Sequence, residues 1–137
     1  MNTIYLEHAN ITVTNLERGI NFFKIAFPSF TIRGEGKSNG KKWVHLGNDN
    51  TYLALYEKIA AQPVAKDMNA AGINHIGFVV ENVQEIANRL TKAGYKRDYP
   101  KQIEEFRIRD YFVDDDGNEF EFVQYLSDKP EEKNKYT

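Results

Sequence analysis

Three side chains in this sequence of 137 residues have types that bind divalent metals: His8, His75 and Glu121. Each lies in a short stretch where apolar and polar residues alternate, which is typical of a half-buried strand. Two imidazoles and one carboxylate suit Fe(II), Mn(II), Zn(II) or Ni(II), and they leave coordination positions open for substrate oxygens. We therefore predict a divalent-metal site with these three residues as its ligands.

The two histidines occupy equivalent positions of an internal repeat. Residues 8–23 align with residues 75–90 at an offset of 67, which places His8 on His75. In each copy a strand pattern is followed by an Asn suited to a helix N-cap and then by apolar residues at helical spacing. The repeat predicts that both histidines lie on the first strand of a similar module, on the face turned away from its helix.

The remaining segments predict the same order of elements in both copies. Helices are expected after Asn15 and Asn82, and Pro28 and Gly94 are expected to end them. Strands are expected at 8–14, 31–33, 42–46 and 51–57, and again at 75–80, 95–97, 106–113 and 119–125. Each copy is therefore βαβββ, and the predicted fold class is α+β.

The domain prediction follows from the repeat. Two modules, residues 4–57 and 73–126, are expected to form curved mixed sheets around a cleft, within a single domain that spans residues 1–137. Residues 58–72 are interpreted as a connector, and residues 127–137 as a polar, frayed tail.

Composition excludes several classes of protein. Lys and Arg number 18 and Asp and Glu 20, so the net charge of −2 lacks the surplus of a general nucleic-acid or membrane-surface binder. The chain has no cysteine, which excludes disulfides, thiolate metal sites and cysteine nucleophiles. No stretch approaches a membrane span, and the first residues do not form a secretory signal. We therefore expect a cytoplasmic protein with no nucleic-acid or membrane partner.

The stretches LEHANITV, INHIGFVV and YFVDDDGNEFEFV resemble the vicinal oxygen chelate superfamily, and the resemblance covers residues 4–126. This superfamily includes glyoxalase, extradiol dioxygenases, methylmalonyl-CoA epimerase, fosfomycin-resistance thiol transferases and metal-free bleomycin-binding proteins. Its members place metal ligands on the first and last strands of each module. The resemblance implies a glyoxalase-like fold, with ligand positions at His8, Ala54, His75 and Glu121.

Ala54 departs from that pattern because alanine cannot bind a metal. The four-ligand set of glyoxalase is therefore incomplete, and a His, His, Glu set survives, as in the dioxygenase and fosfomycin-transferase branches. Glu57 is an alternative fourth ligand, but it lies three positions further along the strand and so on the opposite face. We interpret Glu57 as a solvated charge at the strand end.

Strand alternation also predicts the side chains that line the cavity. The alternatives are that the arginines are solvated strand-edge residues and that the aromatic residues are ordinary core. The predicted substrate-binding residues are Asn10, Trp43, Tyr52, Arg107 and Arg109, with Tyr111 as a catalytic residue on the same side.

The leading hypothesis is a metal-dependent enzyme that acts on a small oxygen-rich, anionic substrate. Tyr111 or an arginine would orient the anion, and Glu121 or metal-activated water would exchange protons. Lyase or isomerase, dioxygenase and thiol-transferase chemistry remain open. The rival hypothesis is a metal-free protein of the bleomycin-resistance type that sequesters a planar ligand on Trp and Tyr rings.

The two modules can pair within one chain or between two chains. The resemblance favours a homodimer with sites at the interface, in which His8 comes from one subunit and His75 and Glu121 come from the other. An isologous interface of this kind would bury the apolar sheet surface twice.

Overall fold

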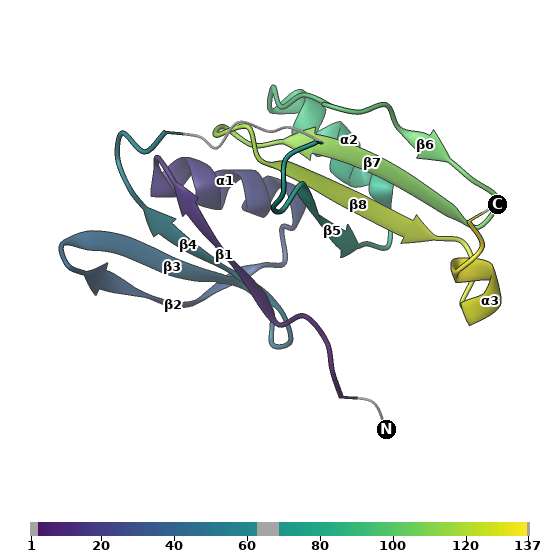
Figure 1. Cartoon of the computed structure of the whole chain (residues 1–137), viewed down its shortest axis with the longest axis horizontal. Helices are drawn as coiled ribbons and strands as arrows, with labels where there is room; N and C mark the ends of the chain where they lie inside the picture. Colours follow the sequence, from purple (N-terminus) through teal and green to yellow (C-terminus); the bar gives the residue numbers. More distant parts are fainter. Residues whose placement is uncertain (1–2, 63–68, 137) are drawn as a thin grey trace. The chain divides into compact units, whose positions relative to one another are not determined.

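The computed structural model describes residues 3–62 and 69–136. The chain divides into two compact units, unit 1 (Met1–Pro63) and unit 2 (Val64–Thr137). Unit 1 contains β1 (His8–Val13), α1 (Leu16–Ala26), β2 (Thr31–Ser38), β3 (Lys41–Gly47) and β4 (Tyr52–Glu57) (Figure 1). Unit 2 contains β5 (His75–Val79), α2 (Val83–Lys92), β6 (Gln102–Ile103), β7 (Arg107–Val113), β8 (Glu119–Tyr125) and α3 (Pro130–Lys133). The predicted βαβββ order is confirmed in both units.

Each unit builds one open, four-stranded mixed sheet. The strand order is β1-β4-β3-β2 in unit 1 and β5-β8-β7-β6 in unit 2. In both sheets the first strand runs parallel to the last, and the other neighbours are antiparallel. The predicted α+β class is confirmed. The consequence for the site is that a side chain on the first strand lies beside one on the last strand.

The predicted N-caps are also confirmed. The Asn15 side chain accepts a hydrogen bond from the Arg18 N–H at 3.0 Å, and Asn82 accepts one from the Glu85 N–H at 3.2 Å. These bonds satisfy N–H groups that have no partner inside a helix. None of the helices within residues 3–62 and 69–136 is long and apolar enough to cross a membrane.

A second cap reaches each helix from the last strand of its sheet. Glu57 Oε2 accepts a hydrogen bond from the Leu16 N–H at 2.9 Å, and Gln124 Oε1 accepts one from the Val83 N–H at 3.0 Å. The interpretation of Glu57 as a solvated charge is therefore wrong. Its carboxylate stabilises the helix N-terminus, where unpaired N–H groups and the helix dipole favour a negative charge.

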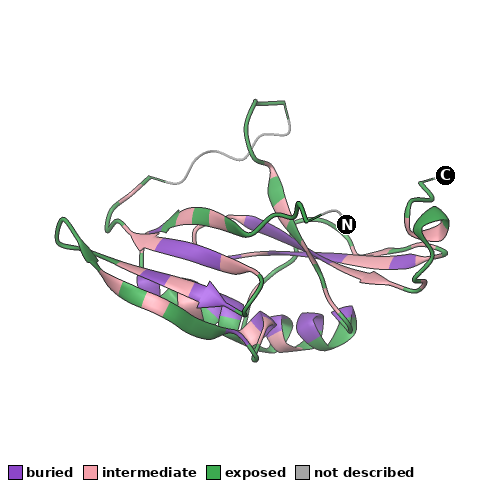
Figure 2. Ribbon diagram, turned by 90° about the horizontal axis from the view of Figure 1, so that it is seen from below, coloured by how far each residue is buried: buried purple, intermediate pink, exposed green. Residues whose placement is uncertain are grey.

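The core of each unit lies between the helix and one face of the sheet. Half-buried and exposed positions alternate along the first strands, and the buried residues of each helix lie against the sheet (Figure 2). The largest fully buried side chains include Phe22, Phe23, Leu46 and Leu55 in unit 1, and Leu90, Phe112, Phe120 and Phe122 in unit 2. This packing leaves the opposite sheet face to the polar and aromatic side chains.

The strand predicted at residues 95–97 is wrong. One backbone hydrogen bond, from Val113 N–H to Lys96 O at 3.1 Å, joins this segment to β7, and regular pairing with β7 occurs at β6 instead. Arg97 uses its side chain to hold the segment, because its guanidinium forms two bonds of 2.8 Å to the Asp110 carboxylate. Asp110 is fully buried on the helix-facing side of β7.

The expectation of a frayed tail is also wrong for residues 127–136, which fold back onto unit 2. After α3, the Tyr136 ring lies 4.7 Å from the Arg107 guanidinium carbon, and Lys135 Nζ lies 2.7 Å from Glu105 Oε2. Lys133 Nζ lies 4.8 Å from the centre of the Tyr125 ring. The polar residues of the tail thus find aromatic and charged partners on β7, β8 and the turn before β7.

The predicted connector, residues 58–72, is described only in part, because residues 63–68 lie outside the described residues. The exact module boundaries remain a prediction.

Candidate metal and substrate site

Three neighbouring strands of unit 2 position the candidate site. In the sheet register His75 of β5 lies opposite Glu119 of β8, and Tyr111 of β7 lies opposite Glu121 of β8. Because side chains alternate along a strand, these four residues share the sheet face that α2 does not cover. The strand parity predicted for His75, Tyr111 and Glu121 is therefore confirmed.

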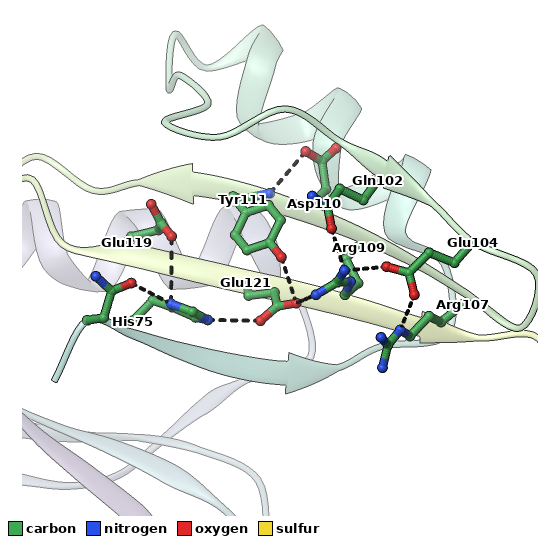
Figure 3. Close-up of polar contacts among 10 residues, drawn as sticks. His75, Gln102, Glu104, Arg107, Arg109, Asp110, Tyr111, Glu119 and Glu121 are labelled. Atoms are coloured by element: carbon green, nitrogen blue, oxygen red, sulfur yellow. Dashed lines mark hydrogen bonds and ion pairs between the residues drawn. The ribbon is translucent and has the colours of Figure 1, made fainter. Parts of the chain in front are cut away.

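His75 and Glu121 contact each other directly. His75 Nε2 lies 3.0 Å from Glu121 Oε2 (Figure 3). On the other side of the ring, the Nδ1–H of His75 donates to Asn74 Oδ1 at 2.8 Å, and Glu119 Oε1 lies 3.8 Å from Nδ1. Both carboxylates are largely buried, and the imidazole is held from both of its nitrogens.

Tyr111 holds the second oxygen of Glu121. Its O–H donates to Glu121 Oε1 at 3.1 Å. Burial raises the pKa of Tyr111 to about 12, and the negative charge of Glu121 adds to the increase. The phenol therefore stays protonated at neutral pH and serves as a hydrogen-bond donor, while Glu121 Oε2 is the oxygen that faces His75.

Arg109 also faces Glu121, but at a longer distance. Its Nη1 lies 3.7 Å from Glu121 Oε1, whereas its Nη2 donates to Gln102 Oε1 and to Glu104 Oε1 in close contacts (Figure 3). Among the described residues, the Arg109 Nε is a buried nitrogen with no hydrogen-bond partner. Nη1, which forms no short hydrogen bond with any described residue, is thus the nitrogen of Arg109 that lies nearest to Glu121.

Arg107 lies further along β7 and has other partners. Its Nε donates to Glu104 Oε2 at 2.5 Å, and its guanidinium lies under the Tyr136 ring. It lines a separate hollow of about 170 Å³ beside the tail. The alternative that Arg107 is a solvated strand-edge residue is wrong, because its side chain is largely buried. Its role in substrate binding remains a prediction.

A cavity of about 560 Å³ opens over this face of unit 2. Polar and charged side chains line it together with two tyrosine rings, and the rings of Tyr99 and Tyr111 meet edge to face at 5.2 Å. The residues that line it are Asn74, His75, Asp98, Tyr99, Gln102, Arg109, Tyr111 and Glu119. This volume suits a small molecule.

The corresponding face of unit 1 is aromatic. Tyr52 stacks between His8 and His45, with ring centres 4.8 and 4.7 Å away, and the Arg33 guanidinium lies 4.3 Å from its ring centre. Trp43 extends this row, with its ring centre 5.0 Å from that of His45. The predicted face for these aromatic residues is confirmed.

Asn10 is exposed on the same sheet face and lies opposite Ala54 in the register. Its predicted role in substrate binding is not tested by these contacts, and it remains a prediction.

His8 belongs to unit 1, whereas His75 and Glu121 belong to unit 2. Its Nδ1–H donates to Glu7 Oε1 at 2.9 Å. Neither unit, over its described residues, gathers three His, Asp or Glu side chains into a metal cluster of its own. The three-residue ligand set therefore stays a prediction, with two of its members in contact.

The contact between His75 and Glu121 fits a metal. Two donors that bind one cation at about 2.1 Å and at right angles lie about 3.0 Å from each other. The observed Nε2–Oε2 distance is 3.0 Å. One imidazole nitrogen and one carboxylate oxygen also form a donor pair suited to Mn(II), Fe(II), Zn(II) or Ni(II).

Sequence reasoning missed Asn74, Gln102, Glu104 and Glu119 as site residues. The repeat carried a signal for Asn74, since the offset of 67 places it on Glu7, and each of these residues binds the Nδ1 of the following histidine. For Gln102 and Glu104 no such signal exists, because their place depends on the turn that joins β6 to β7.

A comparison with known families decides where this arrangement belongs. The sequence matches the profile of the Glyoxalase/Bleomycin resistance protein/Dioxygenase superfamily over residues 5–122. The chain belongs to this superfamily. The match covers both βαβββ units, and it includes the His8, His75 and Glu121 positions.

Known proteins resemble the chain in sequence or in fold. A protein of Bacillus subtilis (strain 168) named "Probable trivalent organoarsenical cleaving enzyme" is 28% identical over 134 residues, which cover 92% of this chain and 84% of that protein. A glyoxylase/bleomycin resistance protein/dioxygenase domain from Frankia sp. EAN1pec has a TM-score of 0.74 at 19% identity, covering 90% of this chain and 99% of that one.

A mutant of FosX, a fosfomycin resistance protein from Listeria monocytogenes, has a TM-score of 0.73 at 18% identity and was solved with Mn(II) and 1S,2S-dihydroxypropylphosphonic acid. The match covers 98% of this chain and 100% of that one. At this identity the similarity shows the shared fold.

Proposed function

We propose that this protein is a divalent-metal-dependent enzyme that acts on a small, oxygen-rich, anionic substrate. The observation that carries the proposal is the 3.0 Å contact of His75 Nε2 with Glu121 Oε2 in unit 2, where His75 also lines the cavity of about 560 Å³. His75, Glu121 and His8 would hold the metal. When bound, the metal would supply Lewis acidity that stabilises negative charge developing on substrate oxygens.

The residues around Glu121 give its two carboxylate oxygens different roles. Tyr111 donates to Oε1, so this oxygen is held and partly neutralised, while Oε2 faces His75 and is available for the metal. Asn74 accepts the Nδ1–H of His75 and so fixes the orientation of the ring, with Nε2 toward Glu121. These bonds give the ligands a defined position before any metal binds.

A bound divalent metal together with Arg109 would favour an anionic substrate, because the metal offsets the Asp98 and Glu119 carboxylates that also line the cavity. The cavity is lined by Arg109, whose Nη1 forms no short hydrogen bond within the described part of the chain, and a guanidinium beside a cation favours anionic oxygens. The FosX structure holds a dihydroxyphosphonic acid together with Mn(II), and a ligand of that chemical class would suit this cavity. We therefore propose a carboxylate- or phosphonate-bearing substrate with neighbouring oxygens.

An organoarsenical is a poorer candidate for this chain. The relative from Bacillus subtilis carries such an activity in its name. Trivalent arsenic is a soft centre that prefers thiolates, and this chain contains no cysteine. Lyase or isomerase, dioxygenase and thiol-transferase chemistry all remain compatible with a substrate that binds through oxygen.

We also propose that the enzyme is a homodimer in which each site takes His8 from one subunit and His75 and Glu121 from the other. His8→Ala and His75→Ala proteins, unfolded and refolded together, should form mixed dimers. Each mixed dimer would contain one site with all three ligands, so about a quarter of all sites should regain metal binding under random pairing. A monomer at micromolar concentration, or no recovery in verified mixed dimers, would contradict the shared site.

A metal-free binding protein is the second candidate, and the aromatic face of unit 1 favours it. The rings of Trp43, His45, Tyr52 and His8 form a continuous row on which a planar ligand could stack. Elemental analysis separates the two candidates when the protein is purified without chelator and then reconstituted. About one divalent metal per chain supports the enzyme, and no metal after reconstitution supports the binder.

A further inference from the structure

Arg109 lies between two carboxylates and contacts them unequally. Its Nη2 is in close contact with Glu104 Oε1, whereas its Nη1 stays 3.7 Å from Glu121 Oε1. A guanidinium and a carboxylate that meet freely form hydrogen bonds of about 2.7–2.9 Å. The longer distance to Glu121 therefore indicates that Arg109 is held by its other partners.

Glu104 is itself held firmly. Its second oxygen, Oε2, accepts the Arg107 Nε–H at 2.5 Å, and its backbone N–H donates to Arg107 O at 2.9 Å. The hydrogen bond from Arg107 also holds the pKa of Glu104 below its ordinary value. Arg107 in turn lies under the Tyr136 ring of the C-terminal segment. The carboxylate of Glu104 is thus charged, and it is fixed between two arginines.

We propose that Glu104 is a positioning residue that holds the Arg109 guanidinium away from Glu121. This inference rests on the proposed role of Glu121 as a metal ligand. Without the Glu104 carboxylate, only the neutral Gln102 Oε1 would remain on Nη2, and the guanidinium would turn to the other carboxylate beside it, closing on Glu121 Oε1. It would then compete with a metal for the carboxylate and place a positive charge closer to the cation.

The test compares two adjacent glutamates in the full-length protein. In Glu104→Gln the carboxylate that holds Arg109 becomes a neutral amide of nearly the same shape. Glu105→Gln is the matched control. This substitution removes the same charge, but Glu105 pairs with Lys135 and not with Arg109. We expect the Kd for Mn(II), measured by electron paramagnetic resonance, to rise about tenfold in Glu104→Gln and by less than about twofold in Glu105→Gln.

A double-mutant cycle separates a positioning role from the simple loss of a charge. If Glu104 acts only as a distant charge, Arg109→Gln changes the Kd by the same factor with or without Glu104. We expect instead that Arg109→Gln restores most of the affinity lost in Glu104→Gln and changes the wild-type Kd by less than about threefold. Equal factors in the two backgrounds would overturn the proposal.

A measurement on the metal-free protein tests the positioning role of Glu104 independently of the proposed metal-dependent function. In a crystal structure of metal-free Glu104→Gln, the Arg109 Nη1–Glu121 Oε1 distance should fall from 3.7 Å to about 2.8 Å. An unchanged distance would overturn the positioning role, even if the wild-type protein binds Mn(II). If the wild-type protein binds none of Mn(II), Fe(II), Zn(II) and Ni(II), the proposed function fails, and this distance still decides the role of Glu104.

A second variant guards against loss of folding in Glu104→Gln. Glu104→Asp keeps the charge but withdraws the carboxylate by one methylene, so Arg109 should again move toward Glu121. We expect a smaller rise in the Kd for Mn(II), of about threefold, and a folded protein by circular dichroism. A wild-type Kd in Glu104→Asp, together with an unmoved Arg109, would contradict the proposal.

Discussion

Gly77 lies directly opposite Glu121 across the ladder between β5 and β8, so a side chain at position 77 would stand beside the Glu121 carboxylate. A Cβ atom built on Gly77 would lie 3.6 Å from Glu121 Oε2, which is ordinary van der Waals contact, whereas further side-chain atoms would approach the carboxylate more closely. In unit 1 the equivalent pair is Asn10 opposite Ala54. In unit 1 the larger residue, Asn10, lies on the first strand and the small one on the last strand, whereas in unit 2 the small residue lies on the first strand and Glu121 on the last. Of these two positions on the last strands, only that of unit 2 carries a carboxylate.

This relationship predicts a graded response at Gly77. Gly77→Ala should bind Mn(II) nearly as the wild type does, because its methyl group fits at contact distance. Gly77→Val should displace the Glu121 carboxylate and lower the affinity at least tenfold. Isothermal titration calorimetry with Mn(II) checks both variants. A Gly77→Val protein that is folded and binds with wild-type affinity would show that Glu121 tolerates a larger side chain beside it.

The raised pKa of Tyr111 predicts that the folded protein loses stability at alkaline pH. Its pKa is about 12 in the folded protein against 10.0 for an ordinary tyrosine, so the unfolded chain ionises first as pH rises. The stabilisation that the protonated Tyr111 gives the folded protein is fully present below pH 10. It is lost as pH rises through 12, which lowers the unfolding free energy by about 2–3 kcal/mol in total.

Urea unfolding of metal-free wild type and Tyr111→Phe across this range isolates the contribution of Tyr111, because the other titrating groups are common to both proteins. The stability advantage of the wild type should shrink with rising pH. A constant difference would mean that the Tyr111 pKa is ordinary.

The ion pair between Arg97 and Asp110 predicts that replacing Arg97 lowers the unfolding free energy more than replacing Asp110 does. Asp110 is 0% exposed, whereas Arg97 is partly exposed. Arg97→Ala leaves a buried carboxylate without its cation, which costs about 3–5 kcal/mol. Asp110→Asn should cost only about 1–2 kcal/mol, because Arg97 can turn toward water.

Chemical denaturation measures both effects. Arg89→Ala, which removes an exposed helix pair with Glu85, is a control that should change the unfolding free energy by less than about 0.5 kcal/mol. Equal costs for Arg97→Ala and Asp110→Asn would contradict the assigned burial.

The helix cap formed by Glu57 predicts that replacing this residue lowers the stability of the protein and leaves its metal affinity unchanged. Glu57→Ala removes the acceptor for the Leu16 N–H and should lower the unfolding free energy by about 1 kcal/mol. Its Kd for Mn(II) should stay at the wild-type value. Gln124→Ala removes the equivalent cap in unit 2 and serves as the comparison. A large loss of metal binding in Glu57→Ala would reopen its assignment as a ligand.

Local patterns predicted much of the fold, because they act over a few residues. Asn15 and Asn82 were recognised as N-caps since a cap needs only its own side chain and the next helical turn. The strand faces of His75, Tyr111 and Glu121 followed from alternation alone. The repeat then placed the first-strand histidines at matching positions.

The errors arose where a contact spans distant parts of the chain. Residues 95–97 alternate like a strand, but Arg97 is committed to Asp110, and the burial of an aspartate in the middle of β7 has no local signal. The contact of Glu104 with Arg109 depends on the turn between β6 and β7. The packing of the tail depends on Tyr136 meeting Arg107 across a long stretch of sequence.

The most direct test of the central claim measures the Mn(II) stoichiometry of the wild type, His75→Ala, Glu121→Ala and the control Glu105→Gln after chelation and reconstitution. His75 and Glu121 lie 3.0 Å apart as a donor pair, so removal of either should abolish tight binding while circular dichroism shows an intact fold. We expect about one Mn(II) per chain in wild type and Glu105→Gln, and none in His75→Ala or Glu121→Ala. Wild-type stoichiometry in the Glu121→Ala protein would contradict it.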